Sequence, residues 1–213
     1  MKATPEIHPV DPLHPAAEPI EAAVRVLASG GVIAFPTGCL YGLGADALRA
    51  AAVDRVFAVK NRPADKPLLV LVPERRFVFD LAVEVPPEAQ KLMDRFWPGK
   101  VTIIFKARGG LPANLTAGTG KIGIRLPGHP VAAALVAAFG RPITGTSANL
   151  SGQKGCHEVA ELDPLLIARL DLMLDAGQLN QGSGSTVVDI SGVEPVVLRE
   201  GAVSQPAILA AVR

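Results

Sequence analysis

The sequence has few aromatic residues and no excess of charge of one sign. Of its 213 residues, 4% are aromatic, and 21 lysines and arginines stand against 20 aspartates and glutamates, for a net charge of +1. A protein that coats nucleic acid nonspecifically usually carries a strong basic excess and aromatic side chains for stacking, so this class is disfavoured. Any anion-binding site must therefore be a local concentration of cations.

Long apolar runs and cysteines are also scarce. The longest apolar run, residues 131–139, is half of the roughly 18 residues that indicate a membrane span, and the first twenty residues lack the apolar segment of a signal peptide. Two cysteines, Cys39 and Cys156, are too few for a secreted disulfide framework and are typical of a reducing compartment, although they leave one bridge open. These absences predict a cytoplasmic protein with no membrane segment.

The chain does have the length and the apolar content for one full hydrophobic core. Its 213 residues, 49% of them hydrophobic, predict a single domain. Five prolines in the first nineteen residues remove amide donors and disfavour helix. We therefore expect residues 1–17 to form an extended, proline-rich N-terminal arm and residues 18–213 to form the folded domain.

Helical and strand patterns alternate along residues 18–213. Apolar residues at helical spacing, short apolar runs, and Gly or Pro at segment ends distinguish the two kinds of element. Because no helices separate the last strands, the pattern predicts one α/β domain around a largely buried mixed sheet. The predicted helices are 20–29, 49–60, 86–97, 131–139 and 205–212, and the predicted strands are 32–35, 68–72, 101–105, 122–126, 171–174, 186–190 and 195–198.

A glycine-rich segment, 36–45, follows the first predicted strand and is interpreted as the link to the next helix. Its glycines allow close backbone approach and its amides could face an anion, but an ordinary turn explains the composition equally well. Gly42, Gly44 and Ala47 match a loose dinucleotide-binding pattern, which their distance from the strand excludes. Segment 118–121 lacks the first glycine and the final hydroxyl of a phosphate loop and is excluded as well.

Three further polar clusters lie near predicted strand ends, where α/β proteins usually place ligands. Segment 60–67 holds three cations stiffened by two prolines, which suits a polyphosphate, although a solvated helix end is the simpler explanation. Strand alternation puts Lys121, Gly123 and Arg125 on one face, toward a pocket or toward solvent. Segment 144–152 gathers hydroxyls and one amide, which bind phosphates but are equally common in turns.

A set of ordered motifs runs through residues 18–204. It comprises Phe35-Pro36-Thr37 with Tyr41-Gly42-Leu43-Gly44-Ala45, Lys60-x-Arg62-Pro63 with Lys66-Pro67-Leu68, Trp97-Pro98-Gly99, Arg125-Leu126-Pro127 with His129-Pro130, Ser147-Ala148-Asn149-Leu150-Ser151-Gly152, Ser185-Thr186-Val187-Val188-Asp189, and Leu198-Arg199 with Gly201. In this order they resemble the YrdC family, the threonylcarbamoyl-AMP synthases that make the activated intermediate for threonylcarbamoyladenosine in transfer RNA.

The resemblance implies a single-domain, twisted mixed α/β sheet flanked by helices, with a positively charged cavity, in the short form of the family. It implies a nucleotidyltransferase that makes threonylcarbamoyl-AMP and pyrophosphate from ATP, L-threonine and bicarbonate, with Mg²⁺ on the nucleotide and no metal site of its own. Downstream tRNA threonylcarbamoyl transferase proteins would then take the product. Direct RNA binding would be weak.

The resemblance also assigns residues. Arg125 is the best partner for the threonine carboxylate because of its bidentate geometry. We expect His129 to support a turn and Cys39 to be a packing residue. By matching positions, Lys60 and Arg62 are the catalytic candidates; Lys60, Arg62, Lys66, Ser147, Asn149 and Arg199 bind ATP; Thr37, Tyr41 and Arg125 bind threonine; and Ser185 and Thr186 are weaker candidates.

Some positions depart from the family pattern. Gly38 and Cys39 replace an acid and a threonine, and Leu71 replaces a histidine, so recognition of the threonine side chain could differ. Lys66 and Lys121 are expected to add positive charge. Two alternatives stay open: a paralogue with a different carbamoyl acceptor, and an RNA-binding or ribosome-associated module that uses the basic concavity. The near-neutral net charge weighs against the second.

Overall fold

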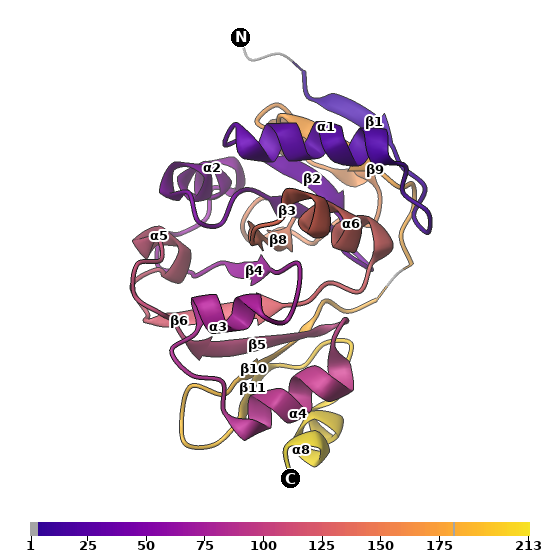
Figure 1. Ribbon diagram of the computed structural model, residues 1–213. Helices are drawn as coiled ribbons and strands as arrows, with labels where there is room; N and C mark the ends of the chain where they lie inside the picture. Colours follow the sequence, from indigo (N-terminus) through magenta and orange to yellow (C-terminus); the bar gives the residue numbers. More distant parts are fainter. Residues whose placement is uncertain (1–3, 181) are drawn as a thin grey trace.

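The computed structural model describes residues 4–180 and 182–213 and contains two mixed β-sheets flanked by helices (Figure 1). One sheet has the strand order β1-β9-β2-β3-β8, and the other has the order β11-β10-β5-β6-β4-β7. The α/β class predicted from the sequence is confirmed, with two sheets in place of one. The strands are β1 (Glu6–Pro9), β2 (Ile33–Pro36), β3 (Tyr41–Gly44), β4 (Leu69–Leu71), β5 (Val101–Lys106), β6 (Lys121–Arg125), β7 (Ile143–Thr144), β8 (Thr146–Ser147), β9 (Leu172–Asp175), β10 (Thr186–Asp189) and β11 (Val196–Arg199).

Two pairs of helices pack together at opposite ends of the molecule (Figure 1). Helices α1 (Ala17–Ala28) and α6 (Pro130–Phe139) contact each other and the five-stranded sheet. Helices α4 (Pro87–Phe96) and α8 (Gln205–Val212) pair beside the six-stranded sheet. The remaining helices are α2 (Ala50–Lys60), α3 (Phe77–Leu81), α5 (Ala113–Thr116), α7 (Pro164–Ile167) and a 3₁₀ turn, Val159–Glu161.

Apolar stripes explain how these helices attach. Helix α1 buries Ile20, Ala23 and Leu27, which recur at helical spacing and share a core with the five-stranded sheet. Helix α4 buries Leu92 and Met93 in the core of the other sheet. Each fully buried side chain of this size contributes about 1.5–3 kcal/mol relative to an exposed one, so the stripes hold the helices in place.

The chain passes from one sheet to the other at Gly145. Strands β7 and β8 lie in different sheets and have only this residue between them. A Cβ atom at Gly145 would lie 2.8 Å from Leu69 and 2.9 Å from Leu71, so a side chain does not fit at the crossing. The amide of Thr144 also donates to the carbonyl oxygen of Ala45 at 2.9 Å, which joins the two sheets. Such a crossing leaves no periodic pattern, which is why the sequence predicts one sheet.

The glycine-rich segment predicted as a link contains strand β3, and this part of the prediction is wrong. Tyr41–Gly44 pairs antiparallel with β2 over its full length. A Cβ atom at Gly42 would lie 2.6 Å from Cγ2 of Thr37, and one at Gly44 would lie 2.9 Å from the Phe35 ring. The glycines therefore permit close packing against neighbouring side chains within a strand.

The N-terminal segment is extended, as predicted, and it pairs with the sheet. Strand β1 runs parallel to β9, with Glu6 opposite Leu172 and Pro9 opposite Asp175. The division between arm and domain after residue 17 stays a prediction. Within the ranges 4–180 and 182–213, every helix is too short or too polar to cross a membrane.

Candidate active site

A cavity of about 890 Å³ is lined by residues from both sheets and from the loops between them. The structure brings several residues predicted from the sequence to this one hollow and leaves the others outside its lining. Those that line it are Thr37, Arg62, Arg125, Ser147, Ser185 and Arg199, and those that do not are Tyr41, Lys60, Lys66, Asn149 and Thr186.

The floor of the cavity is one face of the six-stranded sheet. Val187 pairs with Thr102 on one side and with Arg199 on the other. Because Ile103 lies opposite Ile124, the next position in register places Thr102 beside Arg125. Paired residues point to the same face of a sheet, so Arg125 and Arg199 stand at the two ends of one row of side chains.

Arg125 is a buried cation that has no counter-ion within the described residues. Its side chain is 8% exposed, its Nε is buried without a partner, and its guanidinium makes no hydrogen bond or ion pair within the described residues. Burial, together with the charge of Arg199, lowers the pKa of Arg125 to about 10, and the nearby Cys39 thiol partly opposes this shift. A buried, unpaired guanidinium is costly in the free protein and well suited to bind a carboxylate or phosphate.

Two buried hydroxyls lie between the arginines of this row. Oγ1 of Thr102 and Oγ of Ser185 are 2.9 Å apart, and Nη2 of Arg199 donates to the Ser185 carbonyl oxygen at 2.7 Å. Sequence reasoning missed Thr102. The available signal is its hydroxyl at the second position of an otherwise apolar strand, on the face opposite the core residues Val101 and Ile103.

Arg62 is half-exposed, and hydrogen bonds to backbone carbonyl oxygens of its own loop fix the direction of its side chain. Its Nε donates to the carbonyl oxygen of Lys66 at 3.0 Å, and its Nη2 donates to that of Pro67 at 2.8 Å. Burial lowers the pKa of Arg62 below its usual range, which a nearby Asp65 partly opposes. Its Nη1 has no partner within the described residues, so it is available to a ligand. Lys66 itself is exposed and supplies only its carbonyl oxygen to this arrangement.

Lys60 lies beneath the loop that carries Ser147. It is 2% exposed, and its Nζ donates to the carbonyl oxygens of Ser147 and, at 2.7 Å, of Asn149. The Nδ2 of Asn149 donates to the carbonyl oxygens of Leu150 and Gln153 at 2.7 and 3.0 Å. Ser147 lines the cavity, and its hydroxyl makes no hydrogen bond within the described residues. In this structure Lys60 and Asn149 therefore shape the loop, and contact between either residue and ATP stays a prediction.

The two uncharged residues predicted at the threonine site lie in different places. Thr37 lines the cavity, and its hydroxyl donates to the Leu40 carbonyl oxygen at 2.8 Å. Tyr41 is fully buried; its hydroxyl donates to the Gly177 carbonyl oxygen at 2.8 Å and accepts from the Ala176 amide at 3.0 Å. Tyr41 thus fastens the β2–β3 hairpin to the segment after β9.

Cys39 packs against a neighbouring loop, whereas Nδ1 of the His129 ring is buried with no hydrogen-bond partner within the described residues, and the role of His129 in a turn stays a prediction. Sγ of Cys39 donates to the Ser183 carbonyl oxygen at 3.1 Å, which packs the thiol against segment 182–184. His129 precedes α6, and its carbonyl oxygen accepts from the Ala133 amide in the first turn. Burial lowers the pKa of His129, which keeps the ring neutral at pH 7.

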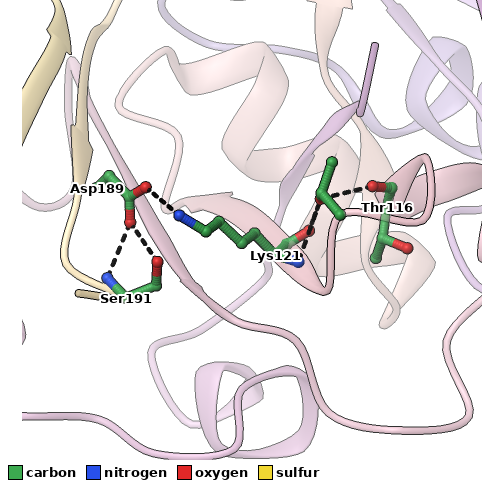
Figure 2. A network of polar contacts seen from close by, with 5 residues as sticks. Thr116, Lys121, Asp189 and Ser191 are labelled. Carbon is green, nitrogen blue, oxygen red and sulfur yellow. Dashed lines mark hydrogen bonds and ion pairs between the residues drawn. The ribbon is translucent and has the colours of Figure 1, made fainter. Parts of the chain in front are cut away.

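The charged side chains of the lining are partly compensated. Lys121 was expected to add positive charge, but its Nζ lies 2.7 Å from Oδ2 of Asp189 (Figure 2). Glu200 accepts the Gln205 amide at 2.8 Å. The lining as a whole has four cations, Arg62, Lys121, Arg125 and Arg199, against the two carboxylates Asp189 and Glu200. Its excess of positive charge therefore resides in the three arginines.

The described residues contain no cluster of metal-binding side chains. Within the described ranges, no group of three or more His, Cys, Asp or Glu residues could hold a metal ion. The carboxylate of Asp189 is already engaged by Lys121 and Ser191. The residues present do not fit a protein-held magnesium ion, and we assign no step to one.

Comparison with known proteins places this geometry in a family. Residues 25–201 match the Sua5/YciO/YrdC family model, which carries the description "Telomere recombination". The chain belongs to this family. The threonylcarbamoyl-AMP synthases of Pyrococcus abyssi and Bacillus subtilis are 38% identical over 185 residues and 37% identical over 194 residues, which cover 85% and 91% of this chain. The chain spans about half the length of these two relatives, 54% and 56%.

A solved member of the family has the same fold. The structure of P. abyssi Sua5 complexed with L-threonine superposes with a TM-score of 0.89 at 33% identity. The match covers 96% of this chain and 60% of that one. The resemblance drawn from the ordered motifs is thereby confirmed at the level of family and fold.

Proposed function

We propose that this chain is a threonylcarbamoyl-AMP synthase, which joins L-threonine, bicarbonate and the AMP part of ATP. The observation that carries the proposal is the buried, unpaired guanidinium of Arg125 in a cavity that also receives Arg62 and Arg199. The names of the two relatives and the threonine-bound family structure support it, and they favour threonine over a different carbamoyl acceptor. They do not favour an RNA-binding module.

The reaction forms two bonds. Bicarbonate loses hydroxide to give carbon dioxide, which the unprotonated amine of threonine attacks to form the nitrogen–carbon bond of a carbamate. The proton that the nitrogen loses combines with the hydroxide as water. A carbamate oxygen then attacks the α-phosphorus of ATP. The bond from that phosphorus to the oxygen bridging the β-phosphate breaks, and pyrophosphate leaves with the electron pair. No covalent enzyme intermediate is needed, so the protein contributes alignment and charge stabilisation.

In this proposal the arginines divide the substrates between them. Arg125 pairs with the threonine carboxylate through its planar fork. Arg62, Arg199 and the Ser147 hydroxyl bind the phosphates and offset the charge that develops as pyrophosphate leaves. Lys60 acts by holding the backbone of the loop that presents Ser147.

The remaining associations are parts of the same proposal. Magnesium would enter on ATP, held by the phosphates. We propose tRNA threonylcarbamoyl transferase proteins as the acceptors of the product and cytoplasmic residence, and we expect at most weak binding of RNA itself. A salt titration of RNA affinity would measure that last expectation, because phosphate contacts weaken as salt rises.

The test of the proposed function is pyrophosphate release by the pure protein with all three substrates and with threonine or bicarbonate omitted. We expect release only when both are present, and we expect Arg62→Ala to lower it about 100-fold. Arg76→Ala is the matched control, because Arg76 is an exposed arginine, ion-paired with Glu74, outside the cavity lining. Equal release with and without threonine would defeat the proposal.

A further inference from the structure

Lys121 and Asp189 form an ion pair inside the cavity that the roles above leave unused. Both residues line the cavity, and Figure 2 shows the lysine side chain extended toward the carboxylate. The side chain of Asp189 is 13% exposed, whereas that of Lys121 is 47% exposed. The ammonium end of the pair is therefore the end that meets a ligand.

Asp189 serves as an anchor for the lysine. Its Oδ1 accepts from the amide and hydroxyl of Ser191 at 2.9 and 2.6 Å, and its Oδ2 accepts from Lys121 (Figure 2). Burial alone would raise the pKa of Asp189, but the hydrogen bonds from Lys121 and Ser191 lower it below its usual value. The carboxylate is therefore charged at neutral pH and has both oxygens occupied.

The ammonium of Lys121 has N–H groups that make no hydrogen bond within the described residues. It can make three hydrogen bonds, and in the described chain its one acceptor is Asp189. Lys121 pairs with Lys106 of β5, and Asp189 pairs with Ile104 of the same strand, so the lysine side chain crosses β5 at the cavity floor. The two remaining N–H groups need acceptors from a ligand.

Lys121 and Arg125 lie at opposite ends of β6, and both line the cavity. The Arg62 guanidinium lies 2.8 Å from the carbonyl oxygen of Pro67, which precedes β4, whereas on the other side of β6 the side chain of Lys121 crosses β5. Arg125 stands four residues beyond Lys121 along β6, roughly 13 Å away. The cavity thus has a Lys121 end and a separate Arg125 end.

We propose that Lys121, held in place by Asp189, binds the terminal phosphates of the nucleotide. This inference rests on the proposed function for the identity of the nucleotide as ATP. Phosphate oxygens supply the acceptors that the ammonium lacks. The Arg125 end is then left to the carboxylate of the amino acid.

The first test measures binding without turnover. Isothermal titration of wild type and Lys121→Met with ATP, AMP and inorganic pyrophosphate compares ligands that differ in their terminal phosphates, and methionine keeps most of the lysine stem. We expect the variant to bind ATP and pyrophosphate about tenfold more weakly and AMP within twofold of wild type. Unchanged ATP affinity, equal weakening of ATP and AMP, or a wild type that binds neither ATP nor pyrophosphate would overturn the inference.

Lys106→Met is the matched control. Lys106 is the β5 residue paired with Lys121, but its ammonium binds Glu84 at 3.0 Å and it does not line the cavity. We expect this variant to bind ATP as wild type does. If Lys106→Met lost as much ATP affinity as Lys121→Met, the effect would come from the total positive charge at this end of the sheet. That result would overturn the inference.

The role of Asp189 as a positioning residue is tested by a double-mutant cycle. Asp189→Asn retains an acceptor for Ser191 and removes the charge that holds Lys121. We expect it to weaken ATP binding several-fold in the wild-type background and not at all in Lys121→Met. Equal weakening in both backgrounds would show that Asp189 acts through the fold, and thermal melting of each variant checks that the fold is kept.

These results separate the two proposals. A wild type that binds ATP but makes no threonine-dependent product would overturn the proposed function and leave the Lys121 inference standing. An active wild type whose ATP affinity does not change in Lys121→Met would overturn the inference alone.

Discussion

The ammonium of Lys60 lies 2.7 Å from the backbone carbonyl oxygen of Asn149, 89 residues further along the chain. A second hydrogen bond to the Ser147 carbonyl oxygen makes Lys60 the support of the loop that faces the cavity. The Ser151 amide in turn donates to the Lys60 carbonyl oxygen at 2.8 Å. The end of α2 and the loop after β8 are thus joined by three hydrogen bonds.

Stability should depend on pH through Lys60. Burial, with the neighbouring charge of Arg62, lowers the pKa of Lys60 from 10.5 to about 7. Between these values the unfolded chain binds a proton that the folded chain does not, so stability rises with pH. The free energy of unfolding of wild type, measured in urea relative to Lys60→Met, should increase by on the order of a few kcal/mol between pH 7 and 10. A difference that is constant with pH would contradict the lowered pKa.

Tyr41→Phe should affect stability more than threonine binding. The substitution leaves the Gly177 carbonyl oxygen and the Ala176 amide without their partner, at a cost of about 1–3 kcal/mol. Because Tyr41 does not line the cavity, we expect the KM for threonine to stay within twofold of wild type. A tenfold rise in KM with no loss in melting temperature would instead support direct contact with threonine.

Arg125→Met should stabilise the free protein while it abolishes threonine-dependent turnover. Removing a buried cation without a partner relieves a desolvation cost, and we expect a gain of about 1 kcal/mol. Threonine should raise the melting temperature of wild type and not that of the variant. Arg125→Lys, which keeps the charge but loses the bidentate fork, should raise the KM for threonine at least tenfold. A less stable Arg125→Met variant would argue that the guanidinium has a structural partner.

Gly123→Ala should narrow the cavity floor. Gly123 shares its strand face with Lys121 and Arg125, and a Cβ atom there would lie 3.3 Å from Cγ2 of Thr102 and 3.4 Å from Cβ of Leu69. We expect kcat/KM to fall about tenfold with a small change in melting temperature. Gly109→Ala is the control, because a Cβ atom at Gly109 meets nothing within 4 Å. Equal activity of the two variants would show that ligands do not approach the floor at Gly123.

The predicted elements with regular apolar spacing all appear in the structure within one to three residues. Helix 131–139 and strand 101–105 are examples, observed as Pro130–Phe139 and Val101–Lys106. The short strand β3 was not predicted, because its glycines resemble loop punctuation and reveal their packing role only beside Thr37 and Phe35. The spacing of apolar residues therefore predicted the regular helices and strands, and it did not predict a strand whose formation depends on packing against distant side chains.

The candidate site shows the same limit. Ordered motifs placed Arg62, Arg125, Ser147 and Arg199 in one functional set, and the structure gathers these four around one cavity. The motifs could not distinguish a residue that faces the cavity from one that supports it. Lys60 carries the same charge as its neighbours in sequence, and only its burial beneath the Ser147 loop reveals where its hydrogen bonds go.

By itself, the amino-acid sequence determined the α/β class, the family, and the residue types available to bind anions. These features depend on apolar periodicity and motif order, which can be read from the sequence without knowing how the chain packs. Tertiary structure alone decided that the strands divide into two sheets, that Arg125 is left unpaired, and that Lys121 meets Asp189 across β5. Those outcomes depend on distances between residues far apart in sequence, which follow from how the whole chain packs.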